Sequence, residues 1–177
     1  MVHHGVANTD RKLENMIEMF KYLDNRFSLD FYLVGNQTYI NQLKEIAKPF
    51  PKIRFLEPVP FNDIIPTMNQ YDIGLAFFEP TTFNLRNCLP NKFFEYIQAR
   101  LMLAIGPSYD MKKIVEQYEL GIVSKNFDSK ELAIELNKLS YEDILIYKEN
   151  SNIASKELCY ENESKKLTAI LDKLLKK

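Results

Sequence analysis

The sequence predicts a three-layer, Rossmann-like α/β domain built on a parallel sheet of about six strands. Six short apolar runs alternate with segments of helical periodicity along the chain. The runs are almost continuously apolar, which is typical of parallel strands buried on both faces beneath helices. The chain has 177 residues, which suits one domain. Because 46% of the residues are hydrophobic and the net charge is −1, a disordered chain and a nucleic-acid-binding protein are both disfavoured.

The first half of the chain contains three of the predicted strands, each followed by a helix. The strand at residues 2–7 precedes N-capping residues and a helix whose apolar positions recur at helical spacing: Leu13, Met16, Ile17, Phe20 and Leu23. A strand at 31–34 ends at Gly35 and leads into a helix that stops near Pro49. The strand at 53–56 precedes a helix at 61–69, which Asn62 is expected to cap and Pro66 to keep short.

The second half continues the same alternation. The most apolar strand, at 73–78, is followed by a polar loop at 79–89 and by a helix that starts at Pro90. A strand at 101–105 leads to a helix capped by Ser108, and the last strand is Ile122-Val123. A helix at 128–139 follows. From Ser140 onward the sequence is helical, opening on a Ser140–Asp143 capping box, and the helices of 140–177 are expected to pack on the domain.

The segment from Leu89 to Tyr96 carries the strongest functional signal. In parallel α/β domains, ligands bind beyond the carboxyl ends of the strands, and Pro90 starts a helix there. The free N–H groups of a first helical turn suit a phosphate, and Lys92 adds a cation. Glu95 lies one turn further on, where a carboxylate accepts two hydroxyl hydrogen bonds, as from a ribose. The competing interpretation is a surface ion pair between Lys92 and Glu95, and spacing alone favours it.

This segment, Leu-Pro-Asn-Lys-x-x-Glu-Tyr after the run Tyr-Asp-Ile-Gly-Leu at 71–75, resembles the carboxyl-terminal domain of GT-B fold glycosyltransferases. It is most similar to the retaining family 4, or group 1, enzymes. The segments 5–14, 30–35, 53–66 and 159–161 agree with the same domain, so the resemblance covers essentially the whole chain. One departure is the turn after the helix: the family commonly shows Ala-x-Gly-x-Pro, and this chain has Ala99, Arg100, Leu101 and Met102.

The resemblance implies a role for each motif residue. Glu95 matches the second glutamate of the family's E-x7-E motif, which holds the ribose of a nucleotide-sugar donor, and Asn87 replaces the first, near the donor sugar. Catalytic roles therefore fall to Arg11, Lys92 and Asn87, with Arg11 and Lys92 neutralising the diphosphate. The helix start, Leu89, Pro90 and Asn91, presents its amides to the phosphates. Two residues outside the motif are weaker candidates: Arg86 for the donor sugar and Phe61 for the nucleobase.

The function implied by the resemblance is that of a nucleotide-diphospho-sugar-binding domain of a retaining glycosyltransferase. The whole enzyme would transfer a sugar to a glycan or lipid-linked acceptor, in surface polysaccharide synthesis. The amino-terminal, acceptor-binding domain is expected to be absent from this chain, so the domain alone should catalyse nothing. Two alternatives stay open: a non-enzymatic nucleotide-binding α/β module, and half of a GT-B nucleotide-sugar epimerase.

Other features bear on cofactors, location and partners. The sequence has no Gly-rich phosphate loop and no Asp-x-Asp pair, so we expect no metal ion or further cofactor. Cys88 and Cys159 read as free thiols, and no signal peptide or membrane span is seen, which favours the cytoplasm. The late helix carries Lys165, Lys166, Lys173, Lys176 and Lys177; it is a candidate for contact with the inner face of a membrane, although lysines snorkelling from a packed helix are the simpler explanation.

Two further expectations concern histidines and self-association. His3 and His4 on the first strand are expected to be structural rather than catalytic. The apolar stripe of the last helix, Leu167, Ile170, Leu171, Leu174 and Leu175, would lack its natural partner if the amino-terminal domain is absent. We therefore expect this helix either to associate with a second copy or to be more mobile than the rest.

Overall fold

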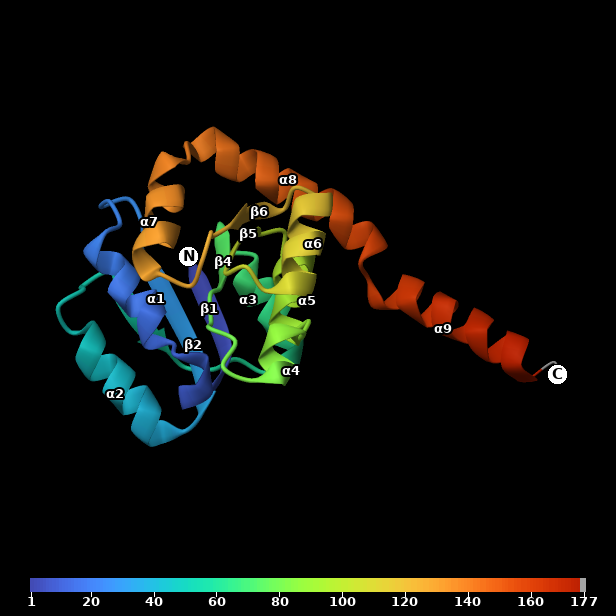
Figure 1. Cartoon of the computed structure of the whole chain (residues 1–177), viewed down its shortest axis with the longest axis horizontal. Helices are drawn as coiled ribbons and strands as arrows, with labels where there is room; N and C mark the ends of the chain where they lie inside the picture. Colours follow the sequence, from blue (N-terminus) through green and yellow to red (C-terminus); the bar gives the residue numbers. More distant parts are fainter. Residues whose placement is uncertain (176–177) are drawn as a thin grey trace.

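The computed structural model describes residues 1–175, with the backbone alone at Asn84. The described residues form one sheet of six parallel strands in the order β3-β2-β1-β4-β5-β6 (Figure 1). The strands are β1 (Val2–Ala7), β2 (Leu29–Gly35), β3 (Ile53–Leu56), β4 (Ile73–Ala76), β5 (Met102–Ile105) and β6 (Gly121–Val123). The strand order reverses between β1 and β4, as in Rossmann-like folds, so the predicted fold class is confirmed.

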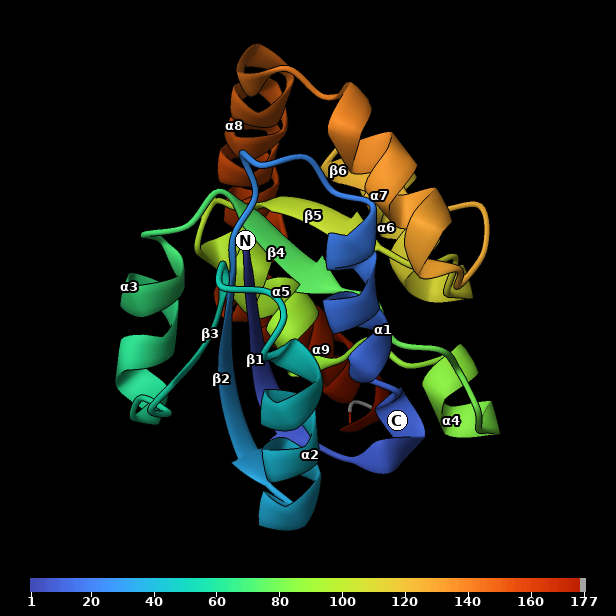
Figure 2. The ribbon, with the colours of Figure 1, turned by 90° about the vertical axis from the view of Figure 1, so that its left-hand side faces the viewer.

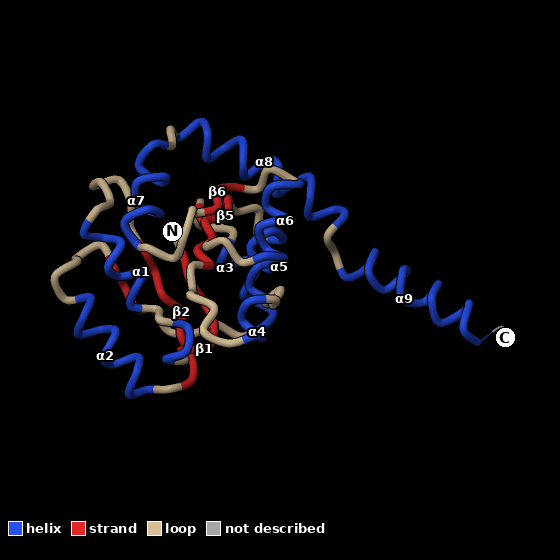
Figure 3. Tube along the Cα trace, in the orientation of Figure 1, coloured by secondary structure: helices blue, strands red, loops and turns tan. Residues whose placement is uncertain are grey.

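Helices cover both faces of the sheet (Figure 3). One layer consists of α1 (Glu14–Glu18), α2 (Gln37–Ala47) and α7 (Ser129–Lys138), which contact one another through α1. The other layer holds α3 (Ile64–Met68), α5 (Asn91–Gln98), α6 (Tyr109–Gln117) and α8 (Tyr141–Glu157). Within it α5 lies centrally, because it contacts α3, α8, β4 and β5. The amino terminus of α5 therefore lies beside the central strands of the sheet.

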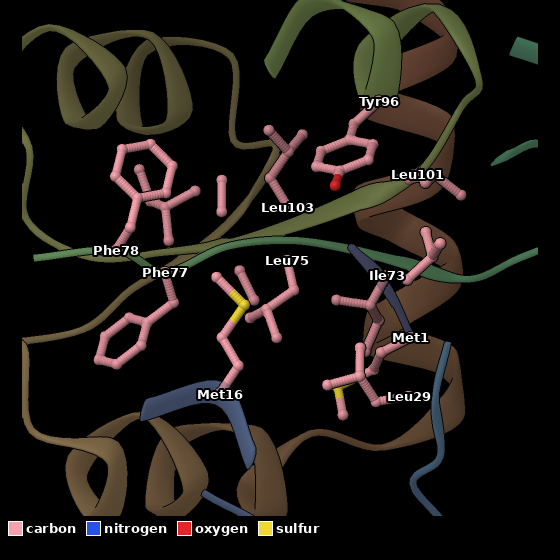
Figure 4. Close-up of a cluster of buried hydrophobic side chains, with 14 of the residues drawn as sticks. Met1, Met16, Leu29, Ile73, Leu75, Phe77, Phe78, Tyr96, Leu101 and Leu103 are labelled. Atoms are coloured by element: carbon pink, nitrogen blue, oxygen red, sulfur yellow. The ribbon is translucent and has the colours of Figure 1, made fainter. Parts of the chain in front are cut away.

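The core explains why the strands read as continuous apolar runs. β4 and β5 are buried at every position. Phe77 and Phe78 follow β4 immediately and are also buried. Figure 4 shows their rings leaving the chain on opposite sides, with Phe77 on the side of Met16 and Phe78 on the side of Tyr96. Each face of the sheet thus receives side chains from the same apolar run, which a two-sided core requires.

Three elements differ in detail from the sequence prediction. The expected helix through Leu13–Leu23 is broken into a 3-10 turn η1 (Thr9–Arg11), α1 and a second 3-10 turn η2 (Met19–Lys21). Lys12 lies between η1 and α1 and has a left-handed φ of 46°. This conformation ends the 3-10 turn η1 before the helix α1 begins. The loop at 79–89 contains a short helix, α4 (Phe83–Arg86). Pro60 rather than Asn62 precedes the turn η3 (Phe61–Asp63) that leads into α3.

The turn between α5 and β5 contains a left-handed residue that is not glycine. Arg100 has a left-handed φ of 63°, a conformation that costs about 1–2 kcal/mol outside glycine. Its guanidinium Nε donates to Asn152 Oδ1 at 2.9 Å and its Nη1 to the Gln98 carbonyl. Hydrogen bonds to the α5 end and to α8 therefore offset the backbone strain that glycine would have avoided.

The carboxyl-terminal helices behave differently from each other. α8 opens on the predicted Ser140–Asp143 capping box and packs on α5 and β5. The helical segment then breaks at Leu158-Cys159, and α9 (Tyr160–Leu175) extends away from the body, as Figure 1 shows; in the turned view of Figure 2, α9 lies behind the sheet. The expectation that all of 140–177 packs on the domain is wrong for α9, which has no buried residue. Its apolar stripe is 47–82% exposed, and Lys176 and Lys177 lie outside the described residues.

The sheet opens between β1 and β4, at the reversal in strand order. Within the described residues, their ladder has a single paired position, Val2 with Gly74, whereas β1 and β2 pair at six. Tyr96 of α5 packs against Gly74 so closely that a Cβ there would lie 2.4 Å from its ring. The backbone N–H of His4 donates instead to the Tyr96 hydroxyl, at 3.2 Å. The crevice between β1 and β4 is thus bridged by side chains of α5.

Candidate functional site

The crevice between β1 and β4 holds a buried chain of hydrogen bonds. His3 Nδ1 lies 2.7 Å from the Leu75 carbonyl oxygen of β4. A carbonyl only accepts, so Nδ1 carries the ring hydrogen, and Nε2 is left as an acceptor. Lys92 Nζ lies 3.2 Å from that Nε2 and donates to it. The lysine predicted at the helix start therefore points inward, into the fold.

Burial sets the charge of this pair. Lys92 is only 4% exposed and His3 is fully buried. Burial, followed by the positive charge of Arg11, lowers the pKa of Lys92 to about 7, against the opposing effect of Glu95. Burial and then the charge of Lys92 lower the pKa of His3 well below 6.5. His3 is therefore neutral near pH 7, while Lys92 is close to half protonated.

Arg11 stands beside Lys92 at the end of η1. Its guanidinium carbon lies 5.8 Å from the centre of the Phe78 ring, and Lys92 Nζ lies 5.9 Å from the same centre. The loop that carries Arg11 is tied to the loop after β4: Lys12 Nζ lies 2.5 Å from Glu79 Oε2, and Thr81 Oγ1 donates to the Asp10 carbonyl at 3.0 Å. Two cations predicted to act on a diphosphate are thus brought to one place.

The amino terminus of α5 completes the cationic side of the site. Pro90 is the capping residue and no side chain hydrogen-bonds to the first turn. The N–H groups of Asn91 and Lys92 have no partner inside the helix, because the first four amides of a helix never do. Asn91 is exposed. This end of α5 therefore offers free amides and the positive end of the helix dipole to an anion.

Glu95 faces His4 rather than Lys92. Its Oε2 lies 3.2 Å from His4 Nε2, in ion-pair range but without hydrogen-bond alignment, and its side chain is 17% exposed. No ion pair joins Lys92 and Glu95 within the described residues. The competing interpretation, a surface pair between these two, is therefore wrong, because the lysine turns into the crevice and the carboxylate toward β1.

A groove of about 680 Å³ runs along α5 beside Glu95. It brings together four of the predicted substrate-binding residues: Phe61, Leu89, Asn91 and Glu95. Apolar side chains make up most of the rest, with Ile65, Phe94, Ile114, Leu158 and Tyr160 among them. Phe61 and Tyr160 are 79% and 82% exposed. The arrangement joins an aromatic wall to two carboxylates, Glu95 and Glu163, which suits a flat, hydroxylated ligand.

Two of the predicted residues lie elsewhere. Arg86 ends α4 and is exposed, with no polar partner within the described residues. Asn87 follows it, also exposed, and its Nδ2 donates to the Phe83 carbonyl at 3.0 Å. Neither residue lines the groove. The structure therefore places Asn87, the E-x7-E counterpart, outside the groove that Glu95 lines.

The residues that sequence reasoning missed are those that support the motif from β1 and β4. His3 and His4 are buried, as expected, but each also contacts one of the motif residues. Gly5 has a φ of 121°, and a Cβ there would lie 3.0 Å from Lys92 Nζ. The sequence did carry a signal for these supporting residues: two adjacent histidines precede a glycine on the strand next to the phosphate-facing loop. It carried no such signal for Phe78, which the apolar pattern assigns only to the core.

The described residues contain neither a cluster of metal ligands nor a membrane-spanning helix. No group of three or more His, Cys, Asp or Glu side chains there is placed to hold a metal ion. None of the described helices is both long enough and apolar enough to cross a membrane. Cys88 and Cys159 are both free thiols, and burial raises the pKa of Cys88.

Comparison with known proteins gives structural but not sequence relatives. No protein family matches the chain by sequence, and no curated protein does. Among solved structures, a glycosyltransferase from Rickettsia africae superposes with a TM-score of 0.80 at 15% identity, covering 99% of this chain and 47% of that chain. HepE from Anabaena, in complex with UDP-glucose, gives 0.77 at 16%, covering 97% and 48%. WaaG, a glycosyltransferase involved in lipopolysaccharide biosynthesis, gives 0.69 at 15%, covering 88% and 42%.

These similarities extend over nearly the whole of this chain and over less than half of each of the three proteins. At such identities they establish the fold. The chain therefore has the fold of one half of a GT-B glycosyltransferase.

Proposed function

We propose that this chain is the nucleotide-sugar-binding domain of a retaining glycosyltransferase. The observation that carries the proposal is the order of groups along the helix α5. Its uncapped amino terminus and Arg11 form a cationic end, and Glu95 lies one turn away in an aromatic-lined groove. A nucleoside diphosphate has the matching order of groups: phosphates, a ribose diol and a flat base.

The roles of the residues follow from this placement. Arg11 and the amides of Asn91 and Lys92 stabilise the charge that develops on the leaving diphosphate. The Glu95 carboxylate accepts hydrogen bonds from the ribose hydroxyls, and Phe61 packs against the base. We propose that this charge is met without a metal ion. Asn87, which follows α4, is assigned to the sugar side of the donor and would have to move toward it on binding.

The acceptor side belongs to the rest of the enzyme. We propose that a second domain supplies it, since the solved relatives are about twice as long, and that the acceptor is a glycan or a lipid-linked sugar in surface polysaccharide synthesis. The lipopolysaccharide role given for WaaG is consistent with that assignment. The whole enzyme would work in the cytoplasm, at the inner face of the membrane if the lysines of α9 contact lipid.

Titration calorimetry with UDP-glucose, UDP and uridine tests the binding proposal. UDP and UDP-glucose should bind, and uridine should bind at least tenfold more weakly because it offers no phosphate to Arg11 and α5 (about 1.4 kcal/mol). Addition of EDTA should leave both affinities unchanged. Equal affinity for UDP and uridine would remove Arg11 and the α5 terminus from the phosphate role. No binding of any of the three would overturn the proposal.

A further inference from the structure

Lys92 is a buried lysine without a carboxylate partner. Its ammonium group has three donors when protonated. Within the described residues its hydrogen-bond acceptor is one atom, Nε2 of His3, at 3.2 Å, and no ion pair holds it. A buried charge that lacks a counter-charge is unfavourable, and the group responds by releasing its proton. Burial without a counter-charge therefore disfavours the ammonium form of Lys92.

The charged and titratable groups around Lys92 come from four places. β1 contributes His3 and His4, and η1 contributes Arg11. Cys88 lies in the loop before α5, and Glu95 lies one turn later on α5 itself. Arg11 opposes the proton on Lys92, whereas Glu95 favours it but is held toward His4. Arg11 and Glu95 act on Lys92 in opposite directions, so an added negative charge nearby would favour the proton.

That negative charge would come from the ligand. Lys92 is the second residue of α5, and its Nζ and the Arg11 guanidinium both lie within 6 Å of the Phe78 ring centre. An anion bound by Arg11 and the first-turn amides would neutralise Arg11, which is the cation that opposes the proton. It would also attract the proton directly through an interior where charges are weakly screened.

We propose that binding of the donor's diphosphate at the start of α5 is coupled to protonation of Lys92. The step moves one proton from solvent to the Nζ lone pair, so that a neutral amine becomes an ammonium ion and no other bond is made or broken. The inference rests on the proposed function, because it takes the diphosphate to be the anion. Lys92 acts here as a buried charge and not as a ligand of the phosphate.

His3 allows Lys92 to gain the proton without a change in the surrounding structure. Its Nδ1–H is fixed by the Leu75 carbonyl, so Nε2 stays an acceptor and stays uncharged. The same lone pair receives a hydrogen bond from the amine and from the ammonium ion. Gly5, which has no Cβ, leaves room for Nζ at that position. The proton can therefore arrive without any rearrangement of β1 or α5.

The test is calorimetric titration of UDP-glucose from about pH 7.5 to about pH 9, in buffers of different ionisation enthalpy. UDP-glucose is the probe because its diphosphate is esterified at both ends and does not titrate in this range. We expect uptake of up to about one proton per ligand, and an affinity that falls up to tenfold per pH unit, since coupling between two bound species is reciprocal.

Two variants assign the proton. Lys92→Arg stays charged at every pH used, so it should bind UDP-glucose without proton uptake and with a flat pH profile. Lys48→Met, at an exposed lysine that directly follows α2, is the matched control and should behave as the parent chain. Binding by the parent chain with no proton uptake, or uptake that persists in Lys92→Arg, would overturn the coupling. Absence of UDP-glucose binding at every pH would instead overturn the proposed function.

Discussion

The Glu95 carboxylate and the His4 imidazole lie 3.2 Å apart, Oε2 to Nε2, and join α5 to β1 at the edge of the groove. His4 is buried, and the side chain of Glu95 is 17% exposed. One carboxylate oxygen therefore faces an imidazole that is fixed in the strand. The contact limits the rotamers of Glu95 before a ligand arrives, which lowers the entropy that binding must overcome.

Glu95→Ala should weaken UDP-glucose binding by about 1.5–3 kcal/mol, roughly ten- to a hundredfold, because charged hydrogen bonds to the ribose are lost. The free energy of unfolding in urea should change by less than the free energy of binding, since Glu95 buries no apolar surface. Calorimetry and urea denaturation measure the two effects. Glu45→Ala, which removes an exposed carboxylate of α2, is the control. A variant that unfolds while keeping its affinity would show that Glu95 serves the structure alone.

The buried lysine predicts how stability depends on pH. The pKa of Lys92 is lowered to about 7 in the fold, so the unfolded chain binds more protons above that pH and stability rises with pH. Between about pH 7.5 and 9.5, the parent chain should gain up to about 1.4 kcal/mol per pH unit relative to Lys92→Met. Urea unfolding at several pH values measures the difference, in which contributions from other groups cancel. Parallel pH profiles of the two chains would contradict the assignment.

The Tyr96 hydroxyl predicts a cost for its removal. It accepts the His4 backbone N–H at 3.2 Å in a fully buried position. Tyr96→Phe leaves that N–H without a partner and should destabilise the fold by about 1–3 kcal/mol. Tyr160→Phe, at an exposed position of α9, should change stability by far less. Equal unfolding midpoints for the two variants in urea would mean that His4 finds another acceptor.

Asp30 predicts part of the acid sensitivity of the fold. Its carboxylate is buried on β2, which by itself raises the pKa, but hydrogen bonds from Arg54 and Tyr71 outweigh burial and leave the pKa lowered. A depressed carboxyl pKa adds stability above the unfolded value and loses it as pH falls through the folded one. Asp30→Asn should therefore flatten the loss of stability below about pH 4. An acid limb as steep as that of the parent chain in guanidinium unfolding would argue against this.

The exposed stripe of α9 predicts self-association of this chain. Removal of residues 160–177 should leave the unfolding midpoint nearly unchanged, because the described part of α9 has no buried residue. Sedimentation velocity should show a concentration-dependent larger species for the full chain and a monomer for the truncated one. Leu167→Glu with Leu174→Glu should reproduce the truncation. A monomeric full chain at every concentration would contradict this prediction.

The fold followed from the sequence because the runs at β4 and β5 are apolar at every position, and only a two-sided core explains that pattern. The motif on α5 was also readable, and four of the residues proposed for the site, Glu95, Asn91, Leu89 and Phe61, line one groove. The direction of Lys92 was not readable. It depends on the opening between β1 and β4 and on the missing Cβ of Gly5, which are long-range facts that helix periodicity does not encode.

The position of Asn87 shows a second limit. Its place in the motif suggested proximity to the donor sugar, but the turn of α4 turns its amide to the Phe83 carbonyl. The loop at 79–89 had read as polar and irregular because four residues of helix carry too little periodicity to detect. Helix α9 likewise had a correct apolar pattern, whereas whether such a pattern is covered depends on neighbours that the pattern does not contain.

The opening between β1 and β4 also changes what kind of join holds the sheet together. A continuous ladder is made of backbone groups, which every residue except proline supplies in full. Here three side-chain contacts do that work: His3 with Leu75, Lys92 with His3, and Tyr96 with His4. Side chains can be exchanged one at a time by mutation and can gain or lose protons. The contacts that join β1 to β4 can therefore be altered by mutation of these side chains and by pH. The backbone ladders of the outer strands do not depend on side chains in this way.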